Sequence, residues 1–165
     1  MTATEYHLAQ INIARARYDT EDPRFQSFID LLEPVNAMAE RMPGFVWRLQ
    51  DESSDGAVDI QAFEDPRIIV NMSVWQDIEA LYAFAFKTAH AKVMTRRREW
   101  FEPMETAYLA LWWIPAGHVP TVEEAKERLA RLDAEGPTPF AFDFRSLFDS
   151  EGNPVAPKLP RRDCA

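Results

Sequence analysis

The stretch NMSVWQDIEALYAFAFKTAHAKVMTRRREWF, residues 71–101, decides the fold of this chain. Its first residues alternate between polar and apolar side chains, which is the pattern of a strand with one buried face. From residue 78 onward the apolar residues recur at helical spacing instead. The stretch therefore predicts the end of a strand over 67–77 and a long helix over 78–101.

The remaining elements are predicted from the same two periodicities. Further strands are expected at 5–14, 45–51 and 106–117, and a helix at 24–41, which Pro34 should kink or split because proline removes an intrahelical hydrogen bond. Thr121 and Glu124 form a capping box that begins a last helix, which Gly136 closes. The order β-α-β-β-α-β plus a C-terminal helix predicts an α+β fold, the ferredoxin-like split βαβ with one antiparallel sheet.

The chain reads as a single domain over 1–150 with an irregular tail over 151–165 that is rich in proline and charge. The strands carry large apolar residues on both faces, whereas two helices of this fold cover one face only. A bare second face would be a large apolar patch. We therefore expect a homodimer that buries this face by sheet-to-sheet packing.

Composition excludes several classes of partner. The formal net charge of −9 argues against nucleic-acid binding, which depends on neutralising phosphates, and no apolar run is long enough for a membrane span. The N-terminal residues show no secretory signal and the chain has one cysteine, Cys164, so we expect a cytoplasmic protein without disulfides. The three histidines lack the spacing of a dedicated metal site, and none is predicted.

The candidate site centres on His90. His90 and Arg97 share one side of the predicted helix with Phe86, and strand 67–77 presents Asn71 on the same face as Trp75. Polar groups on a sheet face beneath an apolar helix are costly in a dry core, so we expect a cavity there. The predicted catalytic residues are His90, Arg97 and Asn71; the predicted substrate-binding residues are Trp75, Phe86, Trp47, Asn12 and His7.

The residue pattern leaves alternatives open for each of these side chains. His90 is read as a core histidine with a local hydrogen-bond partner, as a group facing a pocket, or as a ligand of haem. Arg97 is read either as a pocket cation or as part of a solvated helix end. The tryptophans are read as core packing or as a stacking surface for an aromatic ligand.

Long blocks of the sequence, namely FVWRLQ (45–50), residues 71–101, LALWWIPAGHVPTVEEAKERL (109–129) and GPTPFAFDF (136–144), resemble the bacterial DUF3291 family over nearly the whole chain. That resemblance implies the dimeric α/β-barrel fold. The block VWQDIEALYAFAFKTAHAKV is more distantly similar to antibiotic-biosynthesis monooxygenase-type proteins, which include cofactor-free oxygenases and haem-degrading enzymes. By this similarity His90 matches a helix histidine that binds haem iron in the haem degraders, Asn12 a strand asparagine, and Phe84 lies near the place of a helix tryptophan.

Three functions follow as hypotheses. The first is a cofactor-independent, monooxygenase-like enzyme acting on an aromatic or polyketide-like small molecule between sheet and helix, with His90 as general base. The second is a haem-binding protein with His90 as axial ligand. The third is a non-catalytic ligand-binding dimer in which these residues are structural. No cofactor is predicted for the first, and haem is the alternative.

Overall fold

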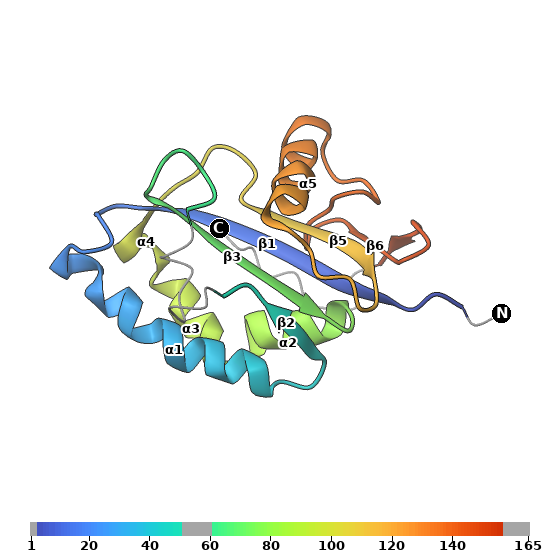
Figure 1. The fold of residues 1–165 in the computed structure, drawn as a ribbon, viewed down its shortest axis with the longest axis horizontal. Helices are drawn as coiled ribbons and strands as arrows, with labels where there is room; N and C mark the ends of the chain where they lie inside the picture. Colours follow the sequence, from blue (N-terminus) through green and yellow to red (C-terminus); the bar gives the residue numbers. More distant parts are fainter. Residues whose placement is uncertain (1–2, 51–60, 157–165) are drawn as a thin grey trace.

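The computed structural model describes residues 3–50 and 61–156. Its main sheet is antiparallel, in the order β2-β3-β1-β5, and the short β4 pairs with the end of β1 (Figure 1). This is the predicted α+β, ferredoxin-like order. The strands are β1 (Tyr6–Ala16), β2 (Phe45–Arg48), β3 (Ile68–Trp75), β4 (Phe101–Glu102) and β5 (Leu109–Pro115), and the helices are η1 (Pro23–Phe25), α1 (Gln26–Arg41), α2 (Ile78–Lys87), α3 (Ala89–Thr95), α4 (Arg97–Trp100) and α5 (Val122–Glu135).

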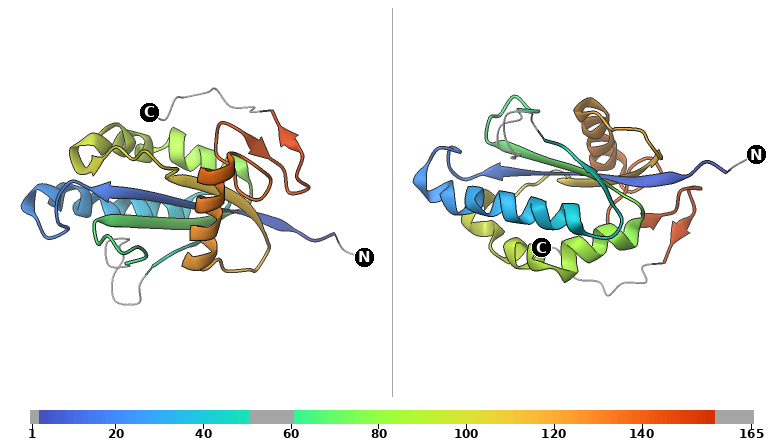
Figure 2. Two further views of the ribbon diagram at one scale, coloured as in Figure 1. Left: turned by 90° about the horizontal axis from the view of Figure 1, so that it is seen from above. Right: turned by 60° about the horizontal axis from the view of Figure 1, so that its bottom comes forward.

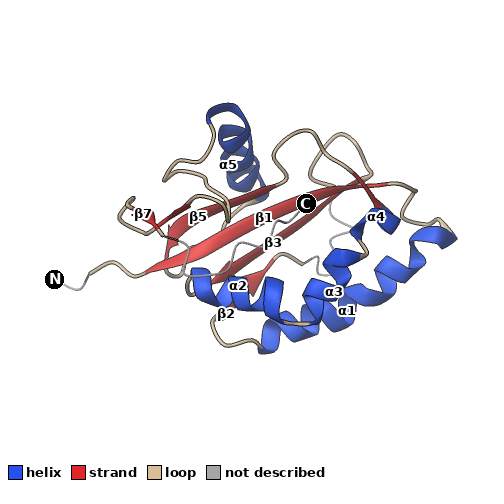
Figure 3. Cartoon of the chain, turned by 180° about the vertical axis from the view of Figure 1, so that it is seen from behind, coloured by secondary structure: helices blue, strands red, loops and turns tan. Residues whose placement is uncertain are grey.

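The sheet lies between two unequal helical layers. Helices α1 to α4 lie along one face, which we call the near face, and α5 lies on the opposite face, the far face (Figure 2). The cartoon seen from behind shows the same separation (Figure 3). The register pairs Asn12 with Asn71 and Ile11 with Met72, so alternate residues of the two central strands belong to different faces.

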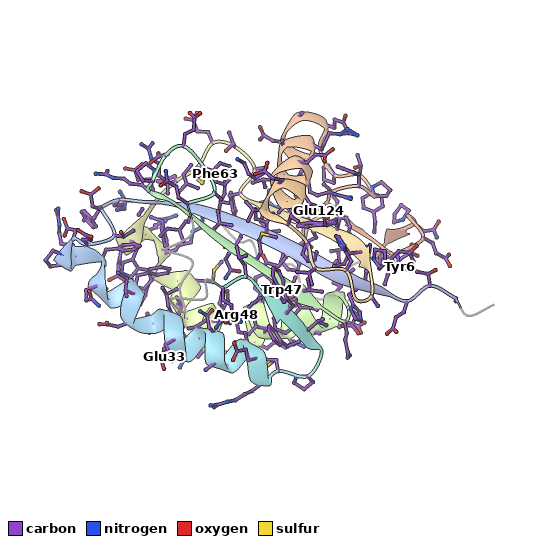
Figure 4. The ribbon with its side chains drawn as sticks, viewed as in Figure 1. Tyr6, Glu33, Trp47, Arg48, Phe63 and Glu124 are labelled. Carbon is purple, nitrogen blue, oxygen red and sulfur yellow. The ribbon has the colours of Figure 1, made fainter. Side chains whose placement is uncertain are left out.

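The far face is the solid core of the molecule. Ile11, Met72 and Trp112 are completely buried there, against Ala125 and Leu129 of α5. Phe63 and Glu124 lie on this side of the sheet (Figure 4). The sequence-based reason for a dimer, a bare second face, is therefore wrong, because α5 and the residues packed with it already cover this face. The dimer itself stays a prediction.

Two expectations about the helices need correction. Helix α1 runs unbroken through Pro34, whose side chain is exposed, so the lost hydrogen bond falls on the solvent side. The single helix predicted over 78–101 is three helices, with breaks at Thr88 and Arg96. Thr88 has an extended backbone, and its hydroxyl donates to the Phe84 carbonyl at 2.6 Å and accepts from the backbone N–H of His90 at 3.2 Å. This side chain closes one helix and caps the next.

Half of the predicted capping box is formed: Thr121 Oγ1 accepts from the backbone N–H of Glu124 at 3.1 Å, and α5 ends before Gly136. The Glu124 carboxylate instead accepts from Trp112 Nε1 at 3.0 Å and lies 2.7 Å from His118 Nε2. Beyond α5, the chain packs its aromatic residues on β5 and forms a hairpin of β6 (Leu147–Phe148) and β7 (Pro154–Val155). This hairpin crosses the boundary predicted at residue 150. The rest of the predicted tail, 157–165, lies outside the described residues. None of the described helices has the length and apolar character needed to cross a membrane.

Candidate functional site

A cavity of about 680 Å³ lies between the near face of the sheet and helices α1 to α4, and Leu132 and Asp133 near the end of α5 also line part of it. This volume falls in the range of small-molecule sites in proteins. The sheet supplies its floor, and α1 and α2 supply mainly apolar walls. Its lining includes Gln10, Asn12, Asn71, Ser73 and Trp75 from the strands, Leu32 and Val35 from α1, and Tyr82, Phe84, Phe86, His90, Val93 and Arg97 from the following helices.

The floor is a network of side-chain amides. Gln10 Nε2 donates to Asn71 Oδ1 and to Ser73 Oγ, both at 2.8 Å, and Asn12 Nδ2 donates to Gln10 Oε1 at 3.0 Å and Asn71 Oδ1 at 3.2 Å. Trp75 Nε1 also donates to Ser73 Oγ at 2.8 Å. These groups sit in one patch because the register places their residues opposite each other on β1 and β3.

The network leaves two polar groups for a ligand. Asn71 uses only its carbonyl oxygen and Asn12 only its amide nitrogen, so Asn71 Nδ2 and Asn12 Oδ1 bond to no other described residue. Both residues are half-buried and line the cavity. A polar group in such a site costs free energy unless water or a ligand pairs with it. The floor can therefore donate hydrogen bonds from Asn71 Nδ2 and accept at Asn12 Oδ1.

His90 is the second residue of α3, two residues after the N-cap Thr88, and it lines the wall of the cavity. Its Nδ1 lies 3.1 Å from the carbonyl oxygen of Ala85. A carbonyl oxygen can only accept, so Nδ1 carries the proton and Nε2 of the neutral ring has a free lone pair. Burial lowers the pKa of His90, and the hydrogen bond to Ala85, which raises it, does not outweigh that effect. The imidazole is therefore neutral at pH 7 and able to accept a proton at Nε2.

An aromatic wall connects the floor to His90. The Trp75 indole stacks on Phe84 with ring centroids 5.3 Å apart, and Phe84 in turn lies 4.9 Å from the His90 ring. Farther along, Phe86 contacts Tyr82 at 4.6 Å and Phe144 of the C-terminal segment at 5.3 Å. Flat apolar surfaces of this kind suit an aromatic ligand.

Two arginines border the cavity in different ways. Arg48 of β2 is buried and its Nε donates to Glu40 Oε1 at 2.7 Å. Arg97, half-buried at the start of α4, places its guanidinium 5.3 Å from the centroid of the Tyr108 ring. A cation over an aromatic face is attracted to it electrostatically.

The structure brings six of the eight predicted site residues to this cavity: Asn12, Asn71, Trp75, Phe86, His90 and Arg97. His7 and Trp47 lie elsewhere. His7 is opposite Ile114 on the far-face side of the sheet, because it shares the parity of Ile11. Trp47 packs in the far-face core, because a bulge between Phe45 and Trp47 reverses the alternation of β2 and turns its neighbour Arg48 to the cavity (Figure 4).

Sequence reasoning missed three residues of the site. Gln10 is at the centre of the amide network. The sequence could have indicated it, because Gln10 lies two residues from Asn12 and therefore on the same strand face. Phe84 is the contact between Trp75 and His90. Arg48 had no usable signal, since its orientation depends on the bulge. Among the described residues there is no cluster of three side chains that could hold a metal ion.

The fold and cavity define an α+β protein with a ligand-sized site between its sheet and its helices. The family model described as "Domain of unknown function (DUF3291)" matches residues 7–158, so the chain belongs to this family. Comparison with curated proteins finds no match.

Several solved structures are similar to the chain. NE2512, a protein of unknown function from Nitrosomonas europaea, is 13% identical over 72% of this chain and 99% of its own, with a TM-score of 0.45. A candidate antibiotic biosynthesis monooxygenase from the same organism is 14% identical over 73% and 99%, with a TM-score of 0.45. SnoaB, a cofactor-independent oxygenase from Streptomyces nogalater, is 17% identical over 71% and 97%, with a TM-score of 0.42. The family match over residues 7–158 confirms the DUF3291 membership expected from the sequence.

Proposed function

We propose that this protein is a cofactor-independent, monooxygenase-like enzyme that acts on an aromatic or polyketide-like small molecule in the near-face cavity. One observation carries the proposal: a neutral imidazole with a free Nε2 lies on a cavity whose floor offers unpaired amide groups. A neutral base and hydrogen-bonding groups that line the same cavity can together remove a proton and hold the resulting anion.

In the proposed step, His90 Nε2 takes a proton from an activated C–H or O–H group of the substrate. The electron pair stays on the substrate as an enolate or phenolate. Dioxygen oxidises this anion, so that an activated CH₂ group and O₂ give a carbonyl group and one water. Dioxygen is the only oxidant, and the balance requires no further reductant.

The other residues hold the anion. Asn71 Nδ2 donates to the substrate oxygen and the Arg97 guanidinium offsets its charge, both from fixed positions on β3 and α4. The stacked pair of Trp75 and Phe84 forms the apolar wall against which the ring system lies. Preorganised groups of this kind act without rearranging as charge develops.

The test uses 1,8-dihydroxyanthrone as a polycyclic probe and measures oxygen uptake. We expect His90→Gln to lower kcat by roughly 10²–10⁴-fold, the usual contribution of a general base. The control is His118→Gln, which makes the same change in a half-exposed histidine bound to Glu124 on the far side of the sheet. Unchanged oxygen uptake in His90→Gln, or no uptake by the parent protein across a panel of anthrones and polycyclic phenols, would contradict the proposal.

Haem binding is the second candidate, because one observation favours it. Metal-bound histidines usually donate their other ring N–H to a carbonyl or carboxylate, as His90 does to Ala85. His90 would then hold the iron through Nε2, and bound haem would supply redox chemistry. Titration with haemin separates the two functions: a Soret shift that is lost in His90→Ala supports haem, and the oxygenase proposal expects no such shift.

The homodimer and the non-catalytic ligand-binding protein remain proposals as well. Native mass spectrometry at micromolar concentration tests the dimer. In a non-catalytic protein, His90→Gln would change the melting temperature, no oxygen would be consumed, and bound small molecules would be released unchanged.

A further inference from the structure

We infer that the natural ligand of the near-face cavity is an acid, an aromatic molecule whose carboxylate binds Arg97. This inference rests on the proposed function only in that the cavity must bind a small molecule. It replaces the enolate charge by a carboxylate as the partner of Arg97, which leaves Asn71 to hold the reacting oxygen, and it does not depend on the role of His90. The observation behind it is a half-buried guanidinium on the cavity wall that forms no ion pair with any residue the structure describes.

The carboxylates that border the cavity have other partners. Glu102 faces Arg15 at 3.7 Å, Asp133 accepts from the backbone N–H of Ala107 at 2.8 Å, and Asp143 accepts from the backbone N–H of Arg145 at 2.9 Å. None of these groups compensates Arg97. Its one described contact is the Tyr108 ring, which attracts a cation but leaves the N–H groups available for oxygen ligands.

The contrast with Arg48 sharpens this point. Arg48 borders the same cavity and is buried, and it carries its own carboxylate partner, Glu40, at 2.7 Å. Burying a charge without a partner is costly, and the fold supplies one for Arg48. For Arg97 the described part of the chain supplies none, so an anionic ligand is the partner that fits.

The surroundings of Arg97 would favour the approach of an anion. Arg17 Nε donates to the backbone carbonyl of Arg98 at 2.7 Å, which brings a third arginine beside Arg97 and Arg98. Neither Arg17 nor Arg98 forms an ion pair within the described residues. In a chain of net charge −9, three neighbouring arginines without an acidic partner among the described residues provide a local positive charge that attracts a negatively charged molecule.

The chemistry of the site favours one carboxylate over a phosphate. A single guanidinium binds a carboxylate through two parallel hydrogen bonds. Most of the other lining side chains are apolar or aromatic, and the amides of Asn12 and Asn71 are neutral. A single acidic group on a largely apolar ring system matches this distribution.

The test compares two probes of nearly equal shape, anthraquinone-2-carboxylate and anthraquinone-2-carboxamide, by isothermal titration calorimetry. We expect the parent protein to bind the acid roughly 10- to 100-fold more tightly than the amide, the range of a hydrogen-bonded charge pair. Arg97→Gln should abolish that preference, and Arg97→Lys should restore part of it because lysine keeps the charge but not the planar fork.

Two matched variants complete the design. Arg98→Gln removes the same charge at the adjacent, exposed position, and Arg145→Gln removes an exposed arginine that also borders the cavity. Both should keep most of the preference for the acid. Equal affinity of the parent for the two probes, no binding of the acid, or a preference that survives in Arg97→Gln would overturn the inference. None of these outcomes depends on oxygen uptake, so the inference and the proposed oxygenase function fail separately.

Discussion

The two faces of the central sheet are built from the same strands and yet differ in kind. On the far face, Ile11 and Met72 are completely buried in a cluster with apolar residues of α5. On the near face, Asn12 and Asn71 occupy the neighbouring positions and border a cavity of about 680 Å³. A step of one residue along either strand moves from solid packing to a polar floor.

This difference separates stability from function in space. Apolar packing on the far face supplies burial energy, because each large side chain there is removed from water. The near face gives up part of that energy, since amides and a cavity replace apolar contacts. Residues that are poor core material but well placed for a ligand are expected at functional sites.

The largest effect on stability should come from truncating a far-face residue of β3, compared with truncating its near-face neighbour. Met72→Ala removes a completely buried side chain from the far face and should lower the free energy of unfolding by about 2–5 kcal/mol. Asn71→Ala, one residue away, removes a half-buried amide from the open floor and should cost about 1 kcal/mol, because water in the cavity can replace its hydrogen bonds. Urea unfolding monitored by tryptophan fluorescence measures both.

In a binding assay the order of the two effects should be reversed, with Asn71→Ala having the larger one. Asn71→Ala is expected to weaken the anthraquinone probes by several-fold, whereas folded Met72→Ala should bind them nearly as the parent protein does. If Met72→Ala and Asn71→Ala lost stability equally, the two faces would not differ in the way described here.

The separation of faces could be predicted from the sequence because it depends only on strand parity. Asn71, Ser73 and Trp75 alternate with buried apolar residues, and so do Gln10 and Asn12 on β1. The N-cap of α5 at Thr121, which accepts from the backbone N–H of Glu124, could be predicted from the sequence in the same way. These features are local, and local patterns survive into the fold.

Features that depend on a single irregularity could not be predicted. The β2 bulge turns Trp47 to the far face and Arg48 to the cavity, and no residue type in FVWR predicts a bulge. The break at Thr88 interrupts an apolar periodicity that would otherwise continue, yet His90 and Arg97 still reach the cavity. The covering of the far face by α5 required knowing on which side of the sheet the C-terminal helix packs, which its amphipathic pattern does not specify.

A smaller effect tests how firmly α2, one wall of the cavity, is held against the end of the loop that precedes β2. Gly44 has a φ of +86°, and a Cβ there would lie 2.6 Å from the Cβ of Ala80 on α2. Gly44→Ala should therefore cost about 1–3 kcal/mol in unfolding free energy through strain and steric conflict. Gly117→Ala is the matched control, since Gly117 has a φ of +92° but no atom within 4 Å of the added Cβ.

The difference between these two variants isolates the contact from the backbone conformation. If Gly44→Ala shifts α2, binding of the anthraquinone probes should weaken along with stability. Equal losses in Gly44→Ala and Gly117→Ala would mean that the near-face layer tolerates displacement at this end.

The smallest predicted effect is a pH dependence of stability that comes from His90 on the near face. In the unfolded chain His90 titrates near pH 6.5, whereas burial lowers its pKa in the folded protein, so the folded state binds fewer protons between the two values. Above about pH 6.5 the ring is neutral in both states and does not change stability. As the pH is lowered below that value, the free energy of unfolding decreases until the pKa of the folded state is passed. Urea midpoints of the parent and His90→Gln, measured from pH 7.5 to 5, should converge or cross as pH falls, with the steeper decline in the parent. Parallel curves would mean that the ring is not held neutral by the fold, and the neutral base beside the amide floor would lose its physical basis.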